Sequence, residues 1–141
     1  MKTIRWFALL ALCAAYLQGG IDKALDFTGA VDEMRHLGLA PATPIALAVI
    51  ALELGASILI LAGFWRWIAA AALAVFTLGA TFVANRFWEL GPPDRFMAAN
   101  AFFEHLGLVG GFVLVAWHDF QRPHVAPGAS VEVHCNPASW P

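Results

Sequence analysis

Charged side chains are scarce in this chain. Lysine, arginine, aspartate and glutamate together supply 13% of its 141 residues. In soluble globular proteins these residues supply about 25%, nearly twice as much. Hydrophobic residues make up 60%, against about 45–50% in such proteins. A small soluble fold exposes much of its surface and needs more charge to stay in solution. The composition therefore argues against a soluble enzyme and predicts an integral membrane protein of one domain.

Several functional motifs are also missing. The eight basic residues are spread singly along the chain, which leaves no basic patch for a phosphate backbone, so nucleic acid is not an expected partner. Only two cysteines occur, Cys13 in the first apolar run and Cys135 near the C-terminus, and they are not expected to form an internal disulfide. No group of residues has metal-ligand spacing, so no metal site is expected. A dinucleotide fingerprint and a P-loop are both absent.

Four long intervals between charged residues are apolar enough to cross a membrane. A spanning helix needs about 20 mostly apolar residues, with a range of about 17–25. The connection between the second and third intervals is very short, so these two helices are expected to be antiparallel neighbours. The four helices are expected near residues 4–21, 44–64, 66–86 and 96–118.

These helices predict an all-α fold, an integral membrane four-helix bundle over residues 1–119. The segment between the first and second helices mixes apolar and charged side chains, at a spacing that allows a short amphipathic helix along the membrane interface. Residues 120–141 contain four prolines and no helical period, so a surface tail is expected there. The first apolar run would also suit a secretory signal peptide. Polar residues at its end look like parts of a site, however, and we expect it to be kept as a true first helix.

The even number of spans places both termini on one side of the membrane. Four basic residues fall on each side, so the positive-inside rule does not decide between the two orientations. Lys2 and Arg5 precede the first helix and favour a cytoplasmic location for both termini.

Two glutamates lie at matching depth inside the expected helices. Glu53 and Glu104 are about nine and eight residues into helices that run in the same direction, which places both carboxylates roughly 12–14 Å below the same face. A charged side chain at mid-bilayer costs about 2.5–3.5 kcal/mol even on insertion scales. We therefore expect one shared, buried polar site, with Glu53, Glu104 and the adjacent His105 as its catalytic candidates.

Further polar side chains are expected in the same half of the bundle. They come from the end of the first helix, from the end of a polar stripe in the third helix, and from one turn before Glu104. Each also has a structural explanation, because polar side chains often hydrogen-bond between membrane helices. The candidate substrate- or quinone-binding residues are Gln18, Asp22, Lys23, Asn85 and Asn100.

Three short motifs resemble those of a known family. Residues 19–23 read Gly-Gly-Ile-Asp-Lys and are followed by Phe27; residues 53–55 read Glu-Leu-Gly, with Leu-Ala-Gly at 61–63; residues 102–106 read Phe-Phe-Glu-His-Leu, with Gly-Gly at 110–111. In their order and spacing these motifs are similar to those of the DoxX family, and the resemblance covers roughly residues 5–118. Many members carry Lys-Asn where this chain has Glu104 and His105, which here gives an acid and an imidazole in place of a base and an amide.

The resemblance implies a small protein of the bacterial cytoplasmic (inner) membrane. The family is named for a membrane subunit linked to thiosulfate:quinone oxidoreductase, so quinone is the candidate cofactor, with none bound covalently. The implied partners are the lipid bilayer and either partner subunits or further copies of the chain. Haem is not expected, because it needs two facing histidines at membrane depth and only His105 qualifies.

Three functions stay open, because family membership alone does not establish catalysis. The first is a quinone-interacting or anchoring subunit of a membrane oxidoreductase, in which a carboxylate and a histidine exchange protons with a quinol. The second is a structural or assembly partner without chemistry of its own. The third is a pathway for a small solute or protons.

Overall fold

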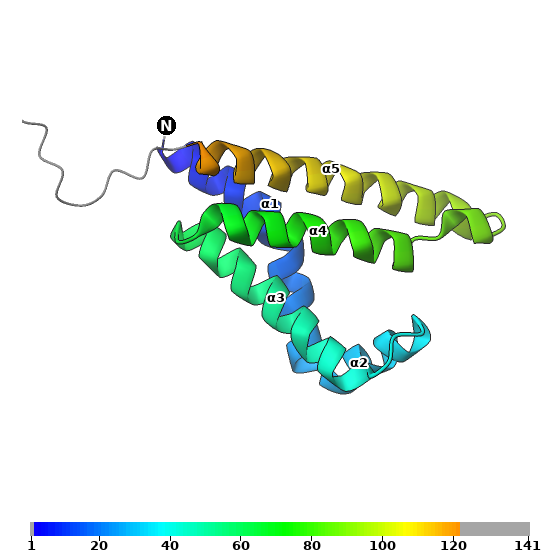
Figure 1. Ribbon diagram of the computed structural model, residues 1–141. Helices are drawn as coiled ribbons and strands as arrows, with labels where there is room; N and C mark the ends of the chain where they lie inside the picture. The colour runs from blue at the N-terminus through cyan, green and yellow to red at the C-terminus, as the bar shows by residue number, and fades with distance from the viewer. Residues whose placement is uncertain (1, 122–141) are drawn as a thin grey trace, which may run out of the picture.

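The computed structural model describes residues 2–121, and within this range the chain is helical with no strand (Figure 1). The expected all-α fold class is confirmed. Of the expected tail, residues 120–141, only the first two positions are among the described residues. The described elements are α1 (Lys2–Leu25), α2 (Phe27–His36), α3 (Ala42–Ala62), α4 (Arg66–Ala84), the short 3-10 helix η1 (Phe87–Glu89) and α5 (Asp94–Phe120).

Four of the described helices, α1, α3, α4 and α5, are long and apolar enough to cross a membrane. They overlap the four ranges expected from the sequence, and α1 continues past Asp22 to Leu25. The amphipathic segment between the first two spans is α2, which is capped at its start because the Asp26 carboxylate accepts a hydrogen bond from the Gly29 N–H at 3.0 Å. Its apolar side, Ala30, Val31 and Met34, is buried against the first half of α3.

A tight turn joins α3 to α4. Gly63 ends α3 with φ +82°, a left-handed conformation that glycine adopts without strain, and its N–H donates to the Leu59 carbonyl at 3.0 Å. The Arg66 Nε then donates to the Ile60 carbonyl at 2.8 Å, which satisfies another carbonyl at the end of α3. The turn leaves α3 and α4 as antiparallel neighbours.

The start of α1, the α3–α4 turn and the end of α5 lie at one end of the bundle, which we call the terminal face (Figure 1). Asp119 ties these elements together, because its Oδ1 lies 3.5 Å from the Arg66 guanidinium and 3.6 Å from that of Arg5. Trp6 and Trp117 flank the same end and are exposed, as expected for side chains at the headgroup level. The opposite end, which carries α2 and η1, is called the distal face.

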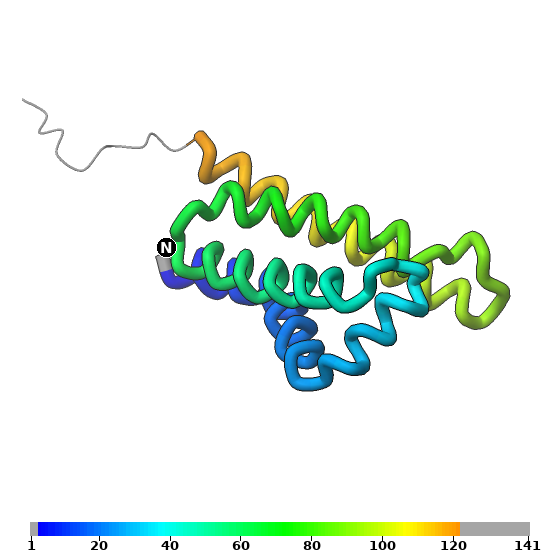
Figure 2. Tube along the Cα trace, turned by 60° about the horizontal axis from the view of Figure 1, so that its bottom comes forward, coloured from blue at the N-terminus to red at the C-terminus, as the bar shows by residue number. Residues whose placement is uncertain are grey.

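The main core lies between the four long helices and includes Cys13 and Tyr16 of α1, Ile60 of α3, Leu73 of α4 and Phe112 of α5. Towards the distal face α4 stays beside α5 (Figures 1 and 2), whereas α3 diverges from them (Figure 1) and packs against α2. The distal half is therefore less closely packed than the terminal half, and the cavity described next lies there.

Candidate functional site

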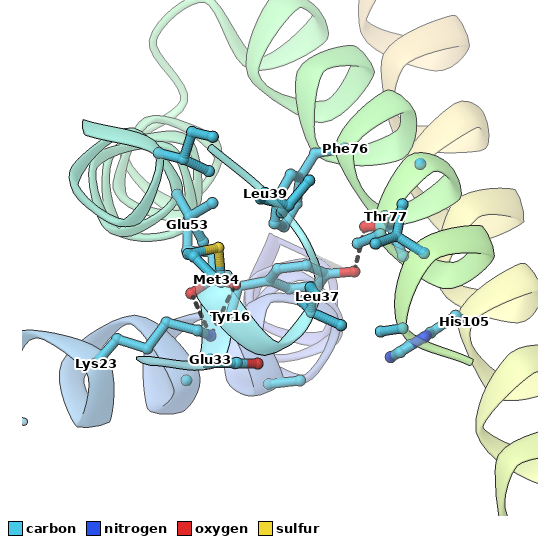
Figure 3. A pocket seen from close by; sticks show the side chains of 18 of the residues that line it. Tyr16, Lys23, Glu33, Met34, Leu37, Leu39, Glu53, Phe76, Thr77 and His105 are labelled. Carbon is cyan, nitrogen blue, oxygen red and sulfur yellow. Dashed lines mark hydrogen bonds and ion pairs between the residues drawn. The ribbon is translucent and has the colours of Figure 1, made fainter. Parts of the chain in front are cut away.

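A cavity of about 590 Å³ lies in the distal half of the bundle, lined by all five α-helices (Figure 3). Small-molecule sites typically have volumes of about 300–1,000 Å³, and this cavity falls within that range. Most of its wall is apolar, including Val49 of α3, Phe76 of α4 and Leu108 of α5. Its polar and charged side chains are Tyr16, Lys23, Glu33, Glu53, Thr77 and His105.

Lys23 and Glu53 form an ion pair in the wall of this cavity. The Lys23 Nζ lies 3.2 Å from each carboxylate oxygen of Glu53, and the two side chains are 21% and 8% exposed. Each charge compensates the other, which matters because a lone buried charge is strongly destabilising. The pair therefore allows a carboxylate to be held inside a membrane-spanning helix.

The close approach of α1 to α3 at Gly20 supports this pair. A Cβ on Gly20 would lie 2.8 Å from Leu54 Cγ, so α1 and α3 cross closely there and a larger residue would force the Leu54 side chain to shift. A Cβ on Gly19 would lie 3.5 Å from the Lys23 Nζ and 3.8 Å from the Glu53 carboxylate. The close crossing brings Lys23, one turn after Gly19, to the side chain of Glu53.

Tyr16 and Thr77 link α1 to α4 on another wall of the cavity. Their hydroxyl oxygens are 2.6 Å apart. The Thr77 hydroxyl donates its hydrogen to the Leu73 carbonyl at 2.6 Å, so the Tyr16 hydroxyl is the donor between the two. Sequence analysis missed Tyr16 as a site residue. It is the single tyrosine of the chain, and a phenol inside an apolar helix is a signal that could have found it.

His105 of α5 contributes an imidazole to the cavity and is held by Asn85 at the end of α4. The Asn85 amide nitrogen lies 2.9 Å from His105 Nδ1. An amide nitrogen can only donate, so Nδ1 accepts and the ring hydrogen lies on Nε2. Asn85 thus positions the ring and fixes its tautomer, and does not itself line the cavity.

The structure brings together three of the predicted residues, Lys23, Glu53 and His105, around one cavity. The expectation that Glu104 joins them in one buried cluster is wrong, because Glu104 is exposed and does not line the cavity. Successive helical residues point about 100° apart, so His105 faces the cavity and Glu104 faces outward.

The other three predicted positions also lie away from the cavity wall. Gln18 and Asp22 hydrogen-bond to each other on the exposed side of α1, and Asn100 is exposed one turn before Glu104. Their expected binding role therefore has no support from the cavity geometry. Glu33 of α2 is an acidic lining residue that sequence analysis did not single out.

The arrangement offers two kinds of polar chemistry inside an apolar wall. The Lys23 ammonium and the His105 Nε2–H can donate hydrogen bonds, and the Glu53 and Glu33 carboxylates can accept them. Within residues 2–121, no three His, Cys, Asp or Glu side chains gather closely enough to hold a metal ion. The cavity therefore suits an apolar molecule that carries a small number of oxygen atoms.

Comparison with known proteins places the chain among small membrane proteins. The model of the DoxX family matches residues 6–86, a range that includes Lys23 and Glu53 but not His105. The chain is 25% identical to the inner membrane protein YphA of Escherichia coli (strain K12) over 128 residues, which cover 82% of this chain and 91% of the relative. No solved structure matches the chain.

Proposed function

The chain belongs to the DoxX family and is a multi-pass membrane protein, and from the chemistry of its cavity we propose that it is a quinone-interacting subunit of a membrane oxidoreductase. The observation that carries the proposal is a cavity of about 590 Å³ between membrane-spanning helices, with apolar walls and an ion pair and an imidazole in its lining. A quinone has an apolar ring and tail with carbonyl oxygens on the ring. Apolar residues would surround the ring, while Lys23 and His105 would donate to the oxygens.

The lining residues can also exchange the protons that quinone chemistry requires. Reduction of a quinone to a quinol takes up two electrons and two protons. The Glu53 carboxylate, paired with Lys23, can take up a proton from water and pass it to the quinone, and the Glu33 carboxylate in the same lining is a second such group. The neutral His105 ring donates a hydrogen bond to a quinone oxygen through its Nε2–H. In this proposal the electrons come from the redox centre of a partner subunit, and this chain supplies the quinone pocket and the proton exchange.

A structural or assembly role is the second candidate, and the outer surface of α5 favours it. Asn100 and Glu104 are exposed on this membrane-spanning helix, and within residues 2–121 neither side chain makes a hydrogen bond or ion pair. A carboxyl group that faces lipid is costly. A helix of a partner subunit or of a second copy would offer both side chains a hydrogen-bond partner, and such contact is compatible with the quinone-interacting role.

Binding of a short-tailed benzoquinone to the purified full chain tests the proposal. The titration would be followed by quenching of tryptophan fluorescence, since the chain has six tryptophans. Ala80 lines the cavity, and Ala80→Phe would fill part of it. The control is Leu78→Phe on the same helix, where the side chain is exposed and does not line the cavity. We expect Ala80→Phe to weaken binding at least about tenfold, or ~1.4 kcal/mol, and Leu78→Phe to leave it unchanged.

Two further measurements distinguish recognition of the quinone ring from nonspecific binding of apolar molecules. An alkane of the same length as the quinone's tail should bind much more weakly than the quinone, because it offers no oxygen to Lys23 or His105. In native membranes, Glu53→Gln should abolish quinone turnover while the variant still co-purifies with its complex, because the amide keeps size but cannot exchange a proton. Equal binding of quinone and alkane, or equal effects of Ala80→Phe and Leu78→Phe, would overturn the proposal.

A further inference from the structure

The cavity in the distal half of the bundle is open beside α2. The backbone of α2 packs against α1 and α3, and within residues 2–121 it does not approach α4, η1 or α5. Glu33 of α2 lines the cavity and is exposed as well. Ala84, at the distal end of α4, is also exposed and lines the cavity. An opening, here called the mouth, therefore lies between α2 and the distal end of α4.

The mouth leads to the buried ion pair. The side chain of Lys23 is 21% exposed, whereas that of its partner Glu53 is 8% exposed, so a water-sized molecule can reach the ammonium group. Figure 3 shows Glu33 on the side of the cavity that carries Lys23 and Glu53. The carboxylates of Glu33 and Glu53 are close enough for their charges to repel each other. Glu33 thus lies between the aqueous phase at the distal face and the pair.

Towards the terminal face the cavity is closed. Tyr16 forms its wall on that side, and the Tyr16 ring meets the ring of Phe112 edge to face with centroids 5.3 Å apart. Cys13, Leu73 and Phe112 are 0% exposed and fill the bundle between Tyr16 and the terminal face. Water and protons can therefore enter the cavity from the distal face, whereas packed side chains block the terminal side.

The lining of the cavity carries one surplus negative charge. Its titratable side chains are Tyr16, Lys23, Glu33, Glu53 and His105. The charges of Lys23 and Glu53 cancel each other, and His105 is neutral because its Nδ1 accepts a hydrogen bond from Asn85. The Glu33 carboxylate is left without a compensating cation in the lining. A cleft lined by one sign of charge concentrates ions of the opposite sign, so this mouth favours cations.

The neighbours of Glu33 on α2 do not cancel its charge. Arg35 is paired with Asp32, at 2.6 Å between Nη1 and Oδ1. The His36 imidazole interacts through Nδ1 with the Asp32 carbonyl at 2.9 Å. These three side chains are exposed and do not line the cavity. Glu33 is therefore the residue of α2 that sets the charge of the mouth.

We propose that protons reach the Glu53 carboxylate from the distal side of the membrane through this mouth, and that the charge of Glu33 attracts them to it. A hydronium ion in the cavity transfers one proton to a carboxylate oxygen of Glu53 and becomes water, and no electron moves in this step. Glu33 acts on Glu53 through the field at the mouth and is a positioning residue. Use of these protons by a quinone rests on the function proposed above, whereas the route itself does not.

Cysteine reactivity in sealed membrane vesicles that contain the full chain tests the route without any quinone. Ala15 and Ala14 are adjacent and exposed on α1, and of the two only Ala15 lines the cavity. Each is replaced by cysteine in a Cys135→Ser background, and labelling of Glu89→Cys by an impermeant maleimide identifies the distal side. The thiolate is the reactive form of cysteine, so its reaction rate with membrane-permeant N-ethylmaleimide reports the proton concentration at the thiol.

The two cysteines should respond differently to pH. We expect the rate at Ala15→Cys to rise about tenfold for each unit by which the pH on the distal side is raised, because the thiolate fraction rises by that factor below the pKa of the thiol. The pH on the terminal side should have no effect. Ala14→Cys lies at the same depth outside the cavity, so it should react much more slowly and follow the pH of neither side.

Charged thiol reagents added on the distal side test the role of Glu33. A cationic methanethiosulfonate should react with Ala15→Cys faster than an anionic one of similar size. Glu33→Gln should lower the ratio of the two rates about fivefold, as expected for the loss of one nearby charge in a hydrated site. Glu33→Asp keeps the charge and should keep the ratio. Asp32→Asn is the matched control, since it removes an exposed carboxylate of α2 that does not line the cavity.

Three results would overturn the proposal. Equal rates at Ala15→Cys and Ala14→Cys would show that no aqueous route reaches the cavity; Ala80→Cys, which also lines it, replaces Ala15→Cys if that variant does not fold. A rate that follows the pH of the terminal side would place the entrance at the other face. Equal rate ratios in Glu33→Gln and Asp32→Asn would remove the role of Glu33. Failure of quinone binding would overturn the proposed function and leave these rates unchanged.

Discussion

The Nζ of Lys23 lies 3.2 Å from both carboxylate oxygens of Glu53, a residue 30 positions later in the chain. This contact joins α1 to α3 and places a neutral pair of charges in the wall of the cavity. From the sequence, Lys23 and Gln18 of the first helix were both expected in the same half of the bundle as Glu53. The structure confirms Lys23 and turns Gln18 towards Asp22 on the exposed side of α1.

Loss of one member of this pair should destabilise the fold more than loss of both. Lys23→Met leaves the Glu53 carboxylate without its partner, so we expect the free energy of unfolding to fall by about 3 kcal/mol. The double variant Lys23→Met with Glu53→Gln has no buried charge left. At least half of the free energy of unfolding lost in Lys23→Met should therefore be recovered. Unfolding in mixed detergent micelles measures both changes. Simple addition of the two single effects would show that the pair makes no energetic contribution.

The crossing of α1 and α3 at Gly20 should be intolerant of a single methyl group. In Gly20→Ala the new Cβ would lie 2.8 Å from Leu54, and overpacking of this kind costs about 1–3 kcal/mol. Leu54→Ala in the same chain should restore part of the stability, because it removes the atoms that clash. Gly110→Ala is the matched control, since nothing lies within 4 Å of its added Cβ. Equal thermal stability of Gly20→Ala and Gly110→Ala would contradict the close crossing.

The Tyr16 side chain should contribute separately through its hydroxyl and its ring. Tyr16→Phe removes the hydrogen bond to Thr77 and should lower the free energy of unfolding by about 0.5–1.5 kcal/mol. Tyr16→Leu also removes the edge-to-face contact with Phe112, whose ring centroid is 5.3 Å away, so a further loss of about 0.5–1.5 kcal/mol is expected. A Tyr16→Phe variant as stable as the unmodified chain would mean that the hydroxyl bond adds nothing to the fold.

The spans and α2 could be predicted because their signals are local. A run of apolar residues long enough to cross a bilayer admits few other structures, and the mixture of apolar and charged residues at 27–36 predicts a short amphipathic helix. The depth of Glu53 could also be counted along α3. This depth, together with the cost of an unpaired charge inside the membrane, indicated that Glu53 would have a partner.

The direction in which each polar side chain of α5 points could not be predicted. An apolar helix that spans a membrane has no hydrophilic side to orient it, so its buried face is set by contact with its neighbours. Phe102 and Phe112 are buried in α5, which turns His105 to the cavity and Glu104 outward. The matching depth of Glu53 and Glu104 therefore suggested one cluster. The rotation of α5 about its axis instead leaves Glu53 paired with Lys23 in the cavity wall and Glu104 on the exposed side.

The orientation of the bundle in the membrane stays a prediction, with both termini expected in the cytoplasm. Single cysteines at Gln121 and at Glu89 would report on the terminal and distal faces, since both positions are exposed. The background would carry Cys135→Ser and keep Cys13, which is buried. In intact cells an impermeant maleimide should label Glu89→Cys and leave Gln121→Cys unlabelled. The reverse pattern would place the termini outside.

The same substitution at the two glutamates should have opposite consequences. Glu53→Leu leaves Lys23 without its carboxylate partner inside the bundle, so the isolated chain should lose stability by about 3 kcal/mol. Glu104→Leu removes an exposed carboxyl group from a membrane-spanning helix, so the isolated chain should keep its stability or gain some.

The two variants should differ again when assembly is measured. If α5 contacts a partner subunit or a second copy through Asn100 and Glu104, then Glu104→Leu should weaken that contact in native membranes. Cross-linking from a cysteine introduced at Gly107, an exposed position one turn further along, would measure it. Glu104→Gln is the matched control, because the amide keeps the hydrogen-bonding capacity and should keep the contact. Unchanged cross-linking in Glu104→Leu would show that this side of α5 faces lipid, and that the carboxyl group is tolerated there without a partner.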